Sequence, residues 1–328
     1  MSHKVTISPA NLEFNVEGET ILSAALAAGI NLPHSCKDGA CSACKCKLAS
    51  GQVTHDQYNL SALSAEEAAD NYILTCKARA NSDITLDLPG FSNGFPIKTL
   101  PAKIESLEKS GSVAVLKLRL PANQVFDFYA GQYVDILFEG QARSYSIANS
   151  PTNKGSLELH IRHRPGGLFS EAVWNKLAVN QILRFKGPLG SFTLQEKSSA
   201  PILLVCGGTG FAPIKSLLEY LQATGNHRQI HLVWGNNRPE DFYLTELLEP
   251  WQAALNLKVQ LCAQENTPAG YFNGTIAQCV EEYYSDLSSF EVYACGNPAM
   301  IEHLYNLTTS KLQLTKTAFF SDAFSPSK

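Results

Sequence analysis

Four cysteines near the start of the 328-residue chain have the spacing of an iron–sulfur site. Cys36, Cys41 and Cys44 follow the pattern C-x4-C-x2-C, and 31 residues separate Cys44 from Cys76. Plant-type 2Fe-2S clusters are held by cysteines with this spacing. The residues between the first three cysteines are mostly small, and Gly39 can adopt a positive φ, so a tight loop is feasible. The four cysteines are therefore predicted to hold a 2Fe-2S cluster, which indicates an electron carrier.

Zinc and disulfide bonds explain these cysteines less well. A zinc site would need a close partner for Cys76, and the sequence provides none. The other five cysteines are scattered, their total of nine is odd, and Met1 to Pro9 has no apolar signal region. We therefore expect reduced cysteines in a cytoplasmic protein, with Cys46, which does not fit the spacing, outside the ligand set.

A second candidate site begins at Arg143-Ser144-Tyr145-Ser146, before a turn that contains proline. Arg143 can bind a phosphate, Tyr145 can lie against a flavin ring, and Ser146 can reach the nitrogen that accepts a hydride. A four-residue match is weak by itself. A surface arginine beside a tyrosine of a barrel core explains it equally well.

Further flavin contacts are predicted downstream of this motif. His160, Ile161 and Arg162 lie on the next strand, and Gly166-Gly167 precede a helix. Glycines before a helix N-terminus allow close approach of a pyrophosphate to free backbone N–H groups. Ser170 either binds the same phosphate or caps the helix.

A third candidate site follows the apolar run that ends at Cys206. The turn Gly207-Gly208-Thr209-Gly210 leads into a helix that has Pro213 in its first turn, as in phosphate-binding strand-to-helix turns. It has neither the G-x-G-x-x-G fingerprint nor the lysine of a P-loop. The second part of the site is Cys295-Gly296, at the predicted end of another strand, where ligands of open α/β sheets bind. Cys295 read in isolation could equally be a small buried hydrophobic residue.

The choice of coenzyme is predicted to depend on the segment after the second strand of this region. An acidic side chain there favours the free ribose hydroxyls of NADH, and an arginine favours the extra phosphate of NADPH. The segment contains both Asp241 and Arg238. NADH is the favoured coenzyme, and NADPH stays open.

The patterns between these motifs predict a multidomain chain of α+β and α/β class. Residues 1–90 form a β-grasp 2Fe-2S ferredoxin domain, which opens with strands at 4–8 and 12–16 and a helix at 19–28. Residues 91–101 are a linker rich in proline and glycine. Short β-type runs predict an antiparallel β-barrel over 102–197, which contains the candidate flavin contacts. Alternating strands and helices predict a parallel-sheet α/β NAD-binding domain over 198–328.

Composition and charge exclude two classes of partner. Hydrophobic residues make up 45% of the chain, and no stretch approaches 18 consecutive apolar residues, so a membrane partner is not expected. The net charge is −4, with 6 Lys+Arg against 10 Asp+Glu in residues 1–90 and 20 of each in the remainder. This balance disfavours nucleic acid. The acidic excess either steers docking to a basic redox partner or forms a solvated face.

Taken together, these motifs resemble the ferredoxin-NADP reductase superfamily with an N-terminal plant-type ferredoxin domain. The resemblance covers nearly the whole chain and implies that electrons pass from NADH to FAD, to the 2Fe-2S cluster and to a partner protein. It also implies FAD rather than FMN, catalytic roles for Ser146 and Cys295, and coverage of the flavin face by Phe324 rather than Phe320.

Within the superfamily, the likeness is greatest to reductases of deoxysugar biosynthesis. Segments that carry it include 143–149, 207–216 and 319–324. The resemblance implies a pyridoxamine-dependent sugar dehydrase as electron acceptor. Reductase components of Rieske dioxygenases and di-iron monooxygenases have the same architecture and are the alternative. A redox sensor or a simple electron-carrier module is the alternative of another class, although a simple carrier would not need residues 198–328.

Overall fold

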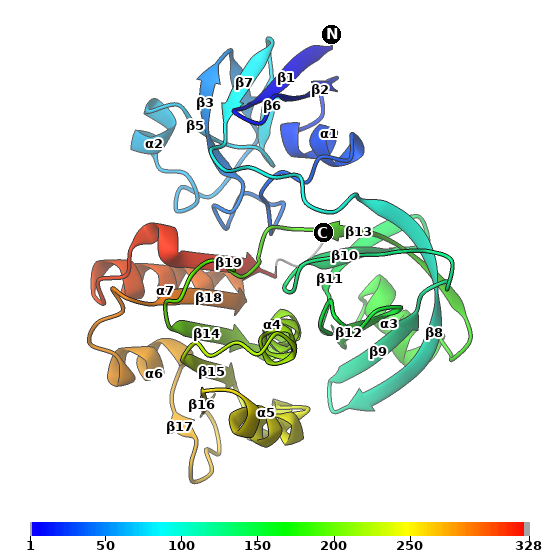
Figure 1. The fold of residues 1–328 in the computed structure, drawn as a ribbon, viewed down its shortest axis with the longest axis vertical. Helices are drawn as coiled ribbons and strands as arrows, with labels where there is room; N and C mark the ends of the chain where they lie inside the picture. The colour runs from blue at the N-terminus through cyan, green and yellow to red at the C-terminus, as the bar shows by residue number, and fades with distance from the viewer. Residues whose placement is uncertain (1, 325–328) are drawn as a thin grey trace. The chain divides into compact units, whose positions relative to one another are not determined.

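The computed structural model describes residues 2–324, so the last four residues of the predicted 198–328 domain lie outside the described residues. The chain divides into two compact units. The first comprises Met1–Ile97 with Leu189–Ser191, and the second comprises Lys98–Pro188 with Phe192–Lys328. In Figure 1 the N-terminal part of the first unit runs from blue to cyan.

The first unit is built on a five-stranded mixed sheet in the order β2-β1-β7-β3-β5. In β1 and β2, Val5 lies opposite Phe14, and both side chains are buried. β1 also pairs in parallel with β7. A separate two-stranded sheet, β4-β6, completes the strands of the unit. The strand bounds are β1 His3–Ser8, β2 Leu12–Val16, β3 Lys45–Ser50, β4 Val53–His55, β5 Tyr72–Leu74, β6 Ala78–Ala80 and β7 Ile84–Asp87.

Side-chain caps define where the two helices of this unit begin. Thr20 accepts a hydrogen bond from Ser23 N at the start of α1 (Ile21–Ala27). Ser64 and Glu67 form the reciprocal capping box of α2 (Ala65–Ala69), as their spacing predicts. α1 is shorter than the predicted helix at 19–28 because its capping residues, Thr20 and Ala28, lie outside the helical turns.

The second unit begins with an antiparallel six-stranded sheet in the order β11-β10-β13-β8-β9-β12. An isolated bridge between Ile147 and Leu159 joins the two edges, so the sheet closes as a barrel. Its interior includes Phe126 and Phe185, whose rings meet edge to face at 5.0 Å. The bounds are β8 Lys98–Ser110, β9 Val113–Arg119, β10 Tyr133–Phe138, β11 Gln141–Ser146, β12 Ser156–Arg162 and β13 Ile182–Leu189, with helix α3 at Leu168–Asn175.

The first barrel strand differs from the sequence-based expectation. β8 begins at Lys98, inside the predicted linker, and Leu100 lies opposite Phe185. Its buried residues Leu100, Ala102 and Ile104 alternate with more exposed neighbours, which is a strand pattern. Pro101 obscured that pattern, because proline within a run argues against a strand.

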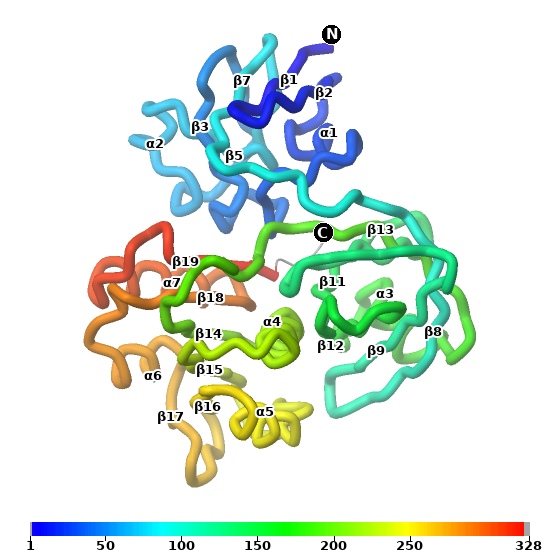
Figure 2. Tube along the Cα trace, in the orientation of Figure 1, coloured from blue at the N-terminus to red at the C-terminus, as the bar shows by residue number. Residues whose placement is uncertain are grey.

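The remainder of the second unit is a parallel sheet in the order β17-β16-β15-β14-β18-β19. Helices α4 and α5 cover one face, and α6 and α7 cover the other, as Figures 1 and 2 show. The strand order reverses between β14 and β18, and ligands of open α/β sheets bind at the carboxyl ends of strands at such a point. The bounds are β14 Ile202–Gly207, β15 Ile230–Asn236, β16 Leu257–Ala263, β17 Phe272–Asn273, β18 Glu291–Gly296, β19 Phe319–Ala323, α4 Phe211–Ala223, α5 Leu248–Ala254, α6 Ile276–Tyr283 and α7 Pro298–Ser310.

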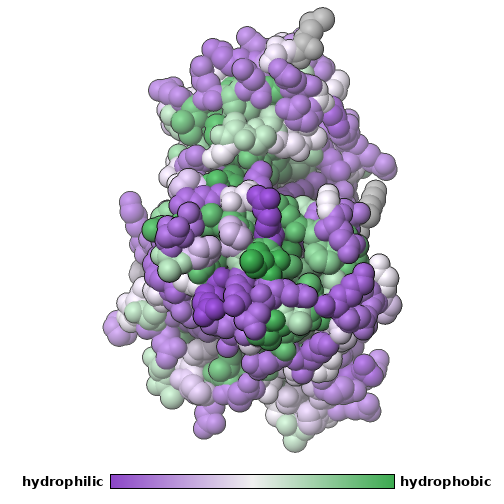
Figure 3. Space-filling view, turned by 90° about the vertical axis from the view of Figure 1, so that its right-hand side faces the viewer, coloured by the Kyte–Doolittle hydropathy of each residue, from purple (hydrophilic) through white to green (hydrophobic). Residues whose placement is uncertain are grey.

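These sheets confirm the predicted classes of the three regions. The surface in Figure 3 shows hydrophobic residues in separate patches between hydrophilic ones. Among the helices of residues 2–324, none has the length and apolar character needed to span a bilayer.

Replacement of Phe185 with alanine tests the barrel core. We expect Phe185→Ala to lower the free energy of unfolding of the second unit by about 3–5 kcal/mol, because this side chain is fully buried. Ile182 lies on the same strand and is 70% exposed, so Ile182→Ala should change it by less than about 0.5 kcal/mol. All three tryptophans lie in the second unit, so their fluorescence during urea unfolding reports on it alone. Equal losses in the two variants would contradict this assignment of the core.

Candidate functional site

The loop that carries Cys36 and Cys41 is shaped by glycine and by hydrogen bonds to sulfur. Gly39 has φ +72°, and a Cβ atom there would lie 2.9 Å from the side chains of Lys77 and Tyr58. The amides of Asp38 and Ala40 lie 3.4 Å and 3.5 Å from Cys36 Sγ, and Cys36 N lies 3.5 Å from Cys41 Sγ. Such N–H groups stabilise thiolates, the form in which cysteine binds metal.

The four predicted cluster ligands lie as two pairs. Cys36 and Cys41 share a hydrogen bond, and Cys44 Sγ lies 3.3 Å from Cys76 Sγ. The pKa of Cys36 is lowered to about 6, first by its hydrogen bond with Cys41 and then, against the effect of burial, by the amides of Ala40 and Asp38. Within residues 2–324, no point is surrounded by three or more His, Cys, Asp or Glu side chains able to hold one metal ion. Two pairs suit a two-iron cluster better than a single zinc ion.

Cys46 lies on β3 and faces the core of the first unit. Burial raises the pKa of its thiol to about 12, so it is a poor thiolate donor. This placement agrees with its exclusion from the predicted ligand set.

The first group of predicted flavin contacts lies on β11. Tyr145 is half-buried, and its ring centroid lies 5.4 Å from that of Phe169, on α3. The guanidinium of Arg143 donates to Ala142 O at 2.9 Å, along its own strand. Ser146 is buried at the end of this strand. Tyr145 and Ser146 therefore lie at the carboxyl end of β11. Their roles toward flavin stay predictions.

The second group lies on β12, and the structure distributes its three residues differently. Ile161 is fully buried in the barrel core, so only its backbone is available to a cofactor. His160 is also buried, and both of its ring nitrogens have partners in the protein. Arg162 is exposed, and its Nη1 would lie 3.1 Å from a Cβ atom placed on Gly208. Its guanidinium therefore lies beside the glycine turn of the predicted nicotinamide site.

The predicted pyrophosphate turn precedes α3. Gly166 has φ +76°, and Gly167 is the N-cap residue of the helix. The Ser170 hydroxyl donates to Arg164 O at 3.0 Å and accepts from Arg164 N at 3.2 Å. Ser170 therefore closes the preceding loop and does not occupy the cap position. A Cβ atom on Gly167 would lie 2.5 Å from Ser170 Oγ, so a larger residue there would displace this hydroxyl from its bonds to Arg164.

The predicted nicotinamide turn lies at the carboxyl ends of β14 and β18. Gly208 has φ +56°, and Gly207, Thr209 and Gly210 continue the turn into α4. A Cβ atom on Gly210 would lie 2.3 Å from Cys295 O, so the start of α4 approaches the end of β18 too closely for a side chain at this position. Gly296 follows with φ +143°. The structure thus brings both predicted parts of this site together.

Asp322 joins the two predicted catalytic residues, although it was not selected from the sequence. It lies on β19 in register with Cys295, and its Oδ2 lies 3.4 Å from Ser146 Oγ. Burial, followed by the negative charge of Asp322, raises the pKa of Cys295, which keeps its thiol protonated. The available signal was a carboxylate within Phe319–Phe324, where four of the six residues are apolar.

Phe320 and Phe324, the two aromatic residues considered for covering the flavin face, lie in different places. Phe320 stacks on Tyr293, with ring centroids 4.7 Å apart and planes at 19°. Phe324 N donates to Gly296 O at 2.8 Å, which places this residue at the predicted nicotinamide turn. This arrangement favours Phe324, the residue preferred from the sequence.

The coenzyme-selecting segment, residues 234–241, contains an arginine that is paired with two carboxylates. Arg238 Nη1 lies 3.4 Å from Glu240 Oε1, and Arg238 Nε lies 3.7 Å from Asp241 Oδ2. Asn236, at the end of β15, was not selected from the sequence. Its side-chain nitrogen is buried without a hydrogen-bond partner among the described residues, and its Oδ1 lies 3.8 Å from the Cβ position of Gly208. A buried amide of this kind fits a ligand in the turn.

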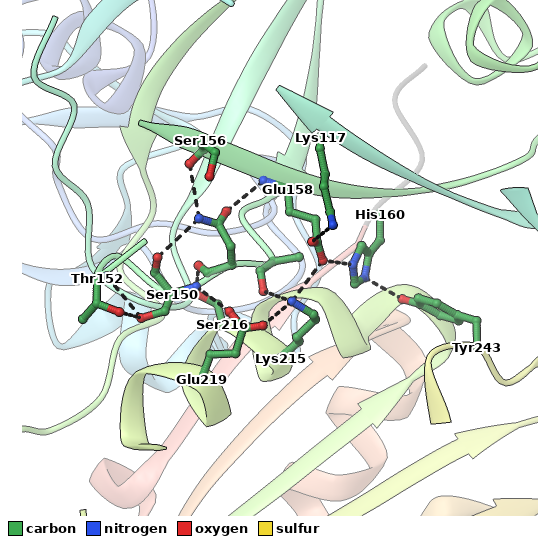
Figure 4. Close-up of polar contacts among 12 residues, drawn as sticks. Lys117, Ser150, Thr152, Ser156, Glu158, His160, Lys215, Ser216, Glu219 and Tyr243 are labelled. Carbon is green, nitrogen blue, oxygen red and sulfur yellow. Dashed lines mark hydrogen bonds and ion pairs between the residues drawn. The ribbon is translucent and has the colours of Figure 1, made fainter. Parts of the chain in front are cut away.

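A buried polar network links α4 to the barrel, as Figure 4 shows. Glu158 Oε1 lies 2.9 Å from His160 Nε2 and 3.0 Å from Lys215 Nζ. His160 Nδ1 lies 2.9 Å from the Tyr243 hydroxyl, and Lys215 also pairs with Glu219 Oε1 at 2.5 Å. Sequence analysis selected only His160 from this group, and for a different role.

The network fixes the protonation states of its members. Burial lowers the pKa of His160, so the ring is neutral, donating to Glu158 through Nε2 and accepting from Tyr243 through Nδ1. Burial by itself raises the pKa of Glu158, but the hydrogen bond from His160 and the charge of Lys215 outweigh it and lower the pKa to about 2. Glu158 is therefore ionised across the neutral range.

The lowered pKa of Glu158 makes stability depend on pH. Its contribution is present above the ordinary pKa of 4.5 and is lost as the pH falls toward 2, up to about 3 kcal/mol. Glu158→Gln should lower the free energy of unfolding by about 3 kcal/mol at pH 7. In this variant the free energy of unfolding should also fall less steeply than in the wild type as the pH is lowered. Urea unfolding at several pH values, followed by tryptophan fluorescence, measures both effects. Glu139, whose side chain is half-exposed, offers Glu139→Gln as the control; a similar response there would contradict the assignment.

Three family descriptions match successive parts of the chain. Residues 5–81 match a 2Fe-2S iron-sulfur cluster binding domain. Residues 102–194 match an oxidoreductase FAD-binding domain, and residues 204–305 match an oxidoreductase NAD-binding domain. These matches confirm the predicted 2Fe-2S cluster, FAD and nicotinamide coenzyme.

Curated relatives extend the likeness to the full chain. The CDP-6-deoxy-L-threo-D-glycero-4-hexulose-3-dehydrase reductase of Yersinia pestis is 41% identical, with 100% of both chains covered. Protein RfbI of Salmonella typhimurium is 36% identical, over 100% of this chain and 98% of that protein. The terephthalate 1,2-dioxygenase reductase component 1 of Comamonas sp is 33% identical over the same shares.

A solved structure has the same architecture. The Amycolatopsis cytochrome P450 reductase GcoB has a TM-score of 0.81 and 26% identity, with 99% of each chain covered. The predicted motifs, the two-unit fold and the full-length relatives thus agree. The chain belongs to the ferredoxin-NADP reductase-like family of NAD(P)H oxidoreductases that carry FAD and an N-terminal 2Fe-2S domain.

Proposed function

We propose that this chain is a cytoplasmic reductase of the CDP-6-deoxy-Δ3,4-glucoseen reductase type, which supplies electrons to a pyridoxamine-dependent sugar dehydrase. The observation that carries the proposal is the 41% identity, over 100% of both chains, to a Yersinia pestis protein named as the reductase of a deoxysugar dehydrase. The dioxygenase reductase from Comamonas is less similar, at 33%. Reductases of this family pass electrons to separate partner proteins, so the chain need contain no sugar site.

When bound, the nicotinamide and flavin exchange a hydride, and the cluster carries single electrons onward. The chain itself supplies binding and orientation. The turn Gly207–Gly210 would offer backbone N–H groups to the coenzyme phosphates, and Asn236 would offer its amide there. Ser146, Cys295 and Asp322 lie together at the ends of their strands and would orient the nicotinamide against the flavin. Cys36, Cys41, Cys44 and Cys76 would hold the cluster.

NADH is the proposed coenzyme. Asp241 can accept hydrogen bonds from the ribose hydroxyls, as acidic residues do in NAD-dependent proteins. Arg238, the residue that would bind the phosphate of NADPH, already faces the carboxylates of Glu240 and Asp241. Its charge is therefore partly compensated before any coenzyme binds.

The surface around the cluster loop is electrically balanced, which bears on how the acceptor docks. Four carboxylates near the cysteines in sequence each pair with a cation, and 36–79 contains as many Lys+Arg as Asp+Glu. The acidic excess therefore belongs to other parts of residues 1–90, and steering by an acidic face around the cluster is not supported. The pairs are Asp38–Lys77, Asp56–Arg79, Glu67–Lys45 and Asp70–Lys47.

Cysteine replacement tests the proposed order of electron transfer. Cys41→Ser should lose the cluster absorbance and the reduction of cytochrome c, a surrogate protein acceptor, while ferricyanide is still reduced directly by the flavin. Cys46→Ala is the matched control and should retain about two irons per chain and both activities. Loss of both activities in Cys41→Ser with FAD still bound would contradict the order from flavin to cluster.

Reconstitution with purified acceptors tests the proposed partner. We expect the dehydrase of the Yersinia system, loaded with its sugar nucleotide, to increase NADH oxidation by this chain, with little dependence on sodium chloride because the cluster surface is balanced. The oxygenase component of terephthalate 1,2-dioxygenase is the comparison. Faster reduction of the oxygenase would replace the deoxysugar assignment, and strong inhibition by salt would contradict docking at the balanced surface.

A further inference from the structure

Lys215 is a buried cation at the start of α4. Its side chain is 5% exposed, and its ammonium group lies 3.0 Å from Glu158 and 2.5 Å from Glu219. Two carboxylates therefore compensate one lysine away from solvent. Transfer of these charges out of water is costly, so such a group persists only where its geometry is well defined. None of the roles assigned above to cofactor-binding residues requires it.

The elements that Lys215 joins all carry predicted cofactor contacts. α4 begins directly after the turn Gly208–Gly210. Glu158 lies on β12, the strand that ends at Arg162 beside Gly208. Through His160, the same carboxylate reaches Tyr243, two residues after Asp241. One buried carboxylate thus connects the glycine turn, the barrel and the coenzyme-selecting segment (Figure 4).

α4 also holds the segment that follows Ser146. Ser216 Oγ donates to Asn149 O at 2.7 Å, and Ser150 N donates to Glu219 Oε2 at 2.9 Å. Lys215 itself lies 3.4 Å from Ala148 O. The first turns of α4 are therefore bonded to β12 and to the segment directly after β11, the two parts of the barrel next to the predicted flavin contacts.

We propose that Lys215 is a positioning residue for flavin reduction: its ion pair with Glu158 sets the place of the nicotinamide turn relative to Ser146. An apolar residue could fill the same volume, but it would allow α4 to slide along the barrel. A charge between two fixed carboxylates has one favoured position. The rate of hydride transfer is sensitive to the position of the nicotinamide turn, because a displacement of about 1 Å can reduce a rate about 100-fold.

The test compares anaerobic flavin reduction by NADH in the intact FAD-loaded protein. We expect Lys215→Met to lower the rate constant at saturating NADH by about 10- to 100-fold, while the Kd for NADH changes less than about threefold. Glu158→Gln should cause a similar loss, and the double variant should be little worse than either single variant. Arg228→Met is the matched control, because Arg228 pairs with Glu291 at 2.6 Å, with both side chains at most 10% exposed, at the start of β15 and β18.

A second readout does not depend on turnover. Hydrogen exchange of the amides at 211–219 in the cofactor-free protein should become faster in Lys215→Met and stay unchanged in Arg228→Met. If Lys215→Met does not fold or loses FAD, Tyr243→Phe, which removes one hydroxyl of the same network, should still slow flavin reduction about threefold or more.

An unchanged rate constant in Lys215→Met, with a melting temperature lowered as in Arg228→Met, would show a merely structural role and overturn the proposal. An unchanged rate in Tyr243→Phe would do so where Lys215→Met cannot be purified. The wild-type reaction with NADH involves no protein acceptor, so either outcome leaves the proposed partner untouched.

Discussion

The second unit depends on a buried ion pair between Lys215 and Glu158. It joins the helix that follows the nicotinamide turn to the barrel strand that carries Arg162, at a spacing of 3.0 Å. Burial of the Lys215–Glu158 pair costs desolvation energy that an apolar contact would not. The pair therefore serves to fix one arrangement of the barrel and the parallel sheet. The lowered pKa of Glu158 follows from the same contact and keeps the carboxylate charged at neutral pH.

Close backbone approach is the second constraint in this unit. Gly210 lies against the carbonyl of Cys295, and no larger residue fits without moving the start of α4 away from β18. This contact lies at the edge of the parallel sheet where Asp322 of β19 is beside Cys295 and contacts Ser146 of the barrel. Residues from three distant parts of the chain therefore share one small region, where the protein contributes orientation and leaves the redox chemistry to its cofactors.

Much of the fold and of the candidate site could be predicted from the sequence because their signals are local. The first three cysteines, the glycine turns and the capping box at Ser64 each depend on residues within a few positions of one another, and Cys76 adds a fixed longer spacing. The signals failed where they conflicted, as at Pro101 within β8. They also failed where a residue has a partner far along the chain. Ser146 and Asp322 are 176 residues apart, and no pattern around either one indicates the other.

The sequence by itself determined the kind of cofactors and their order, since cluster, flavin and nicotinamide motifs each require particular residues at particular spacings. Only the tertiary structure decided which side chains meet: His160 in a polar network, Arg162 beside Gly208, and Asn236 with a buried amide at the same turn. The physical reason is that covalent spacing fixes turns and ligand loops. Contacts between sheets depend on how whole elements pack, which no short segment encodes.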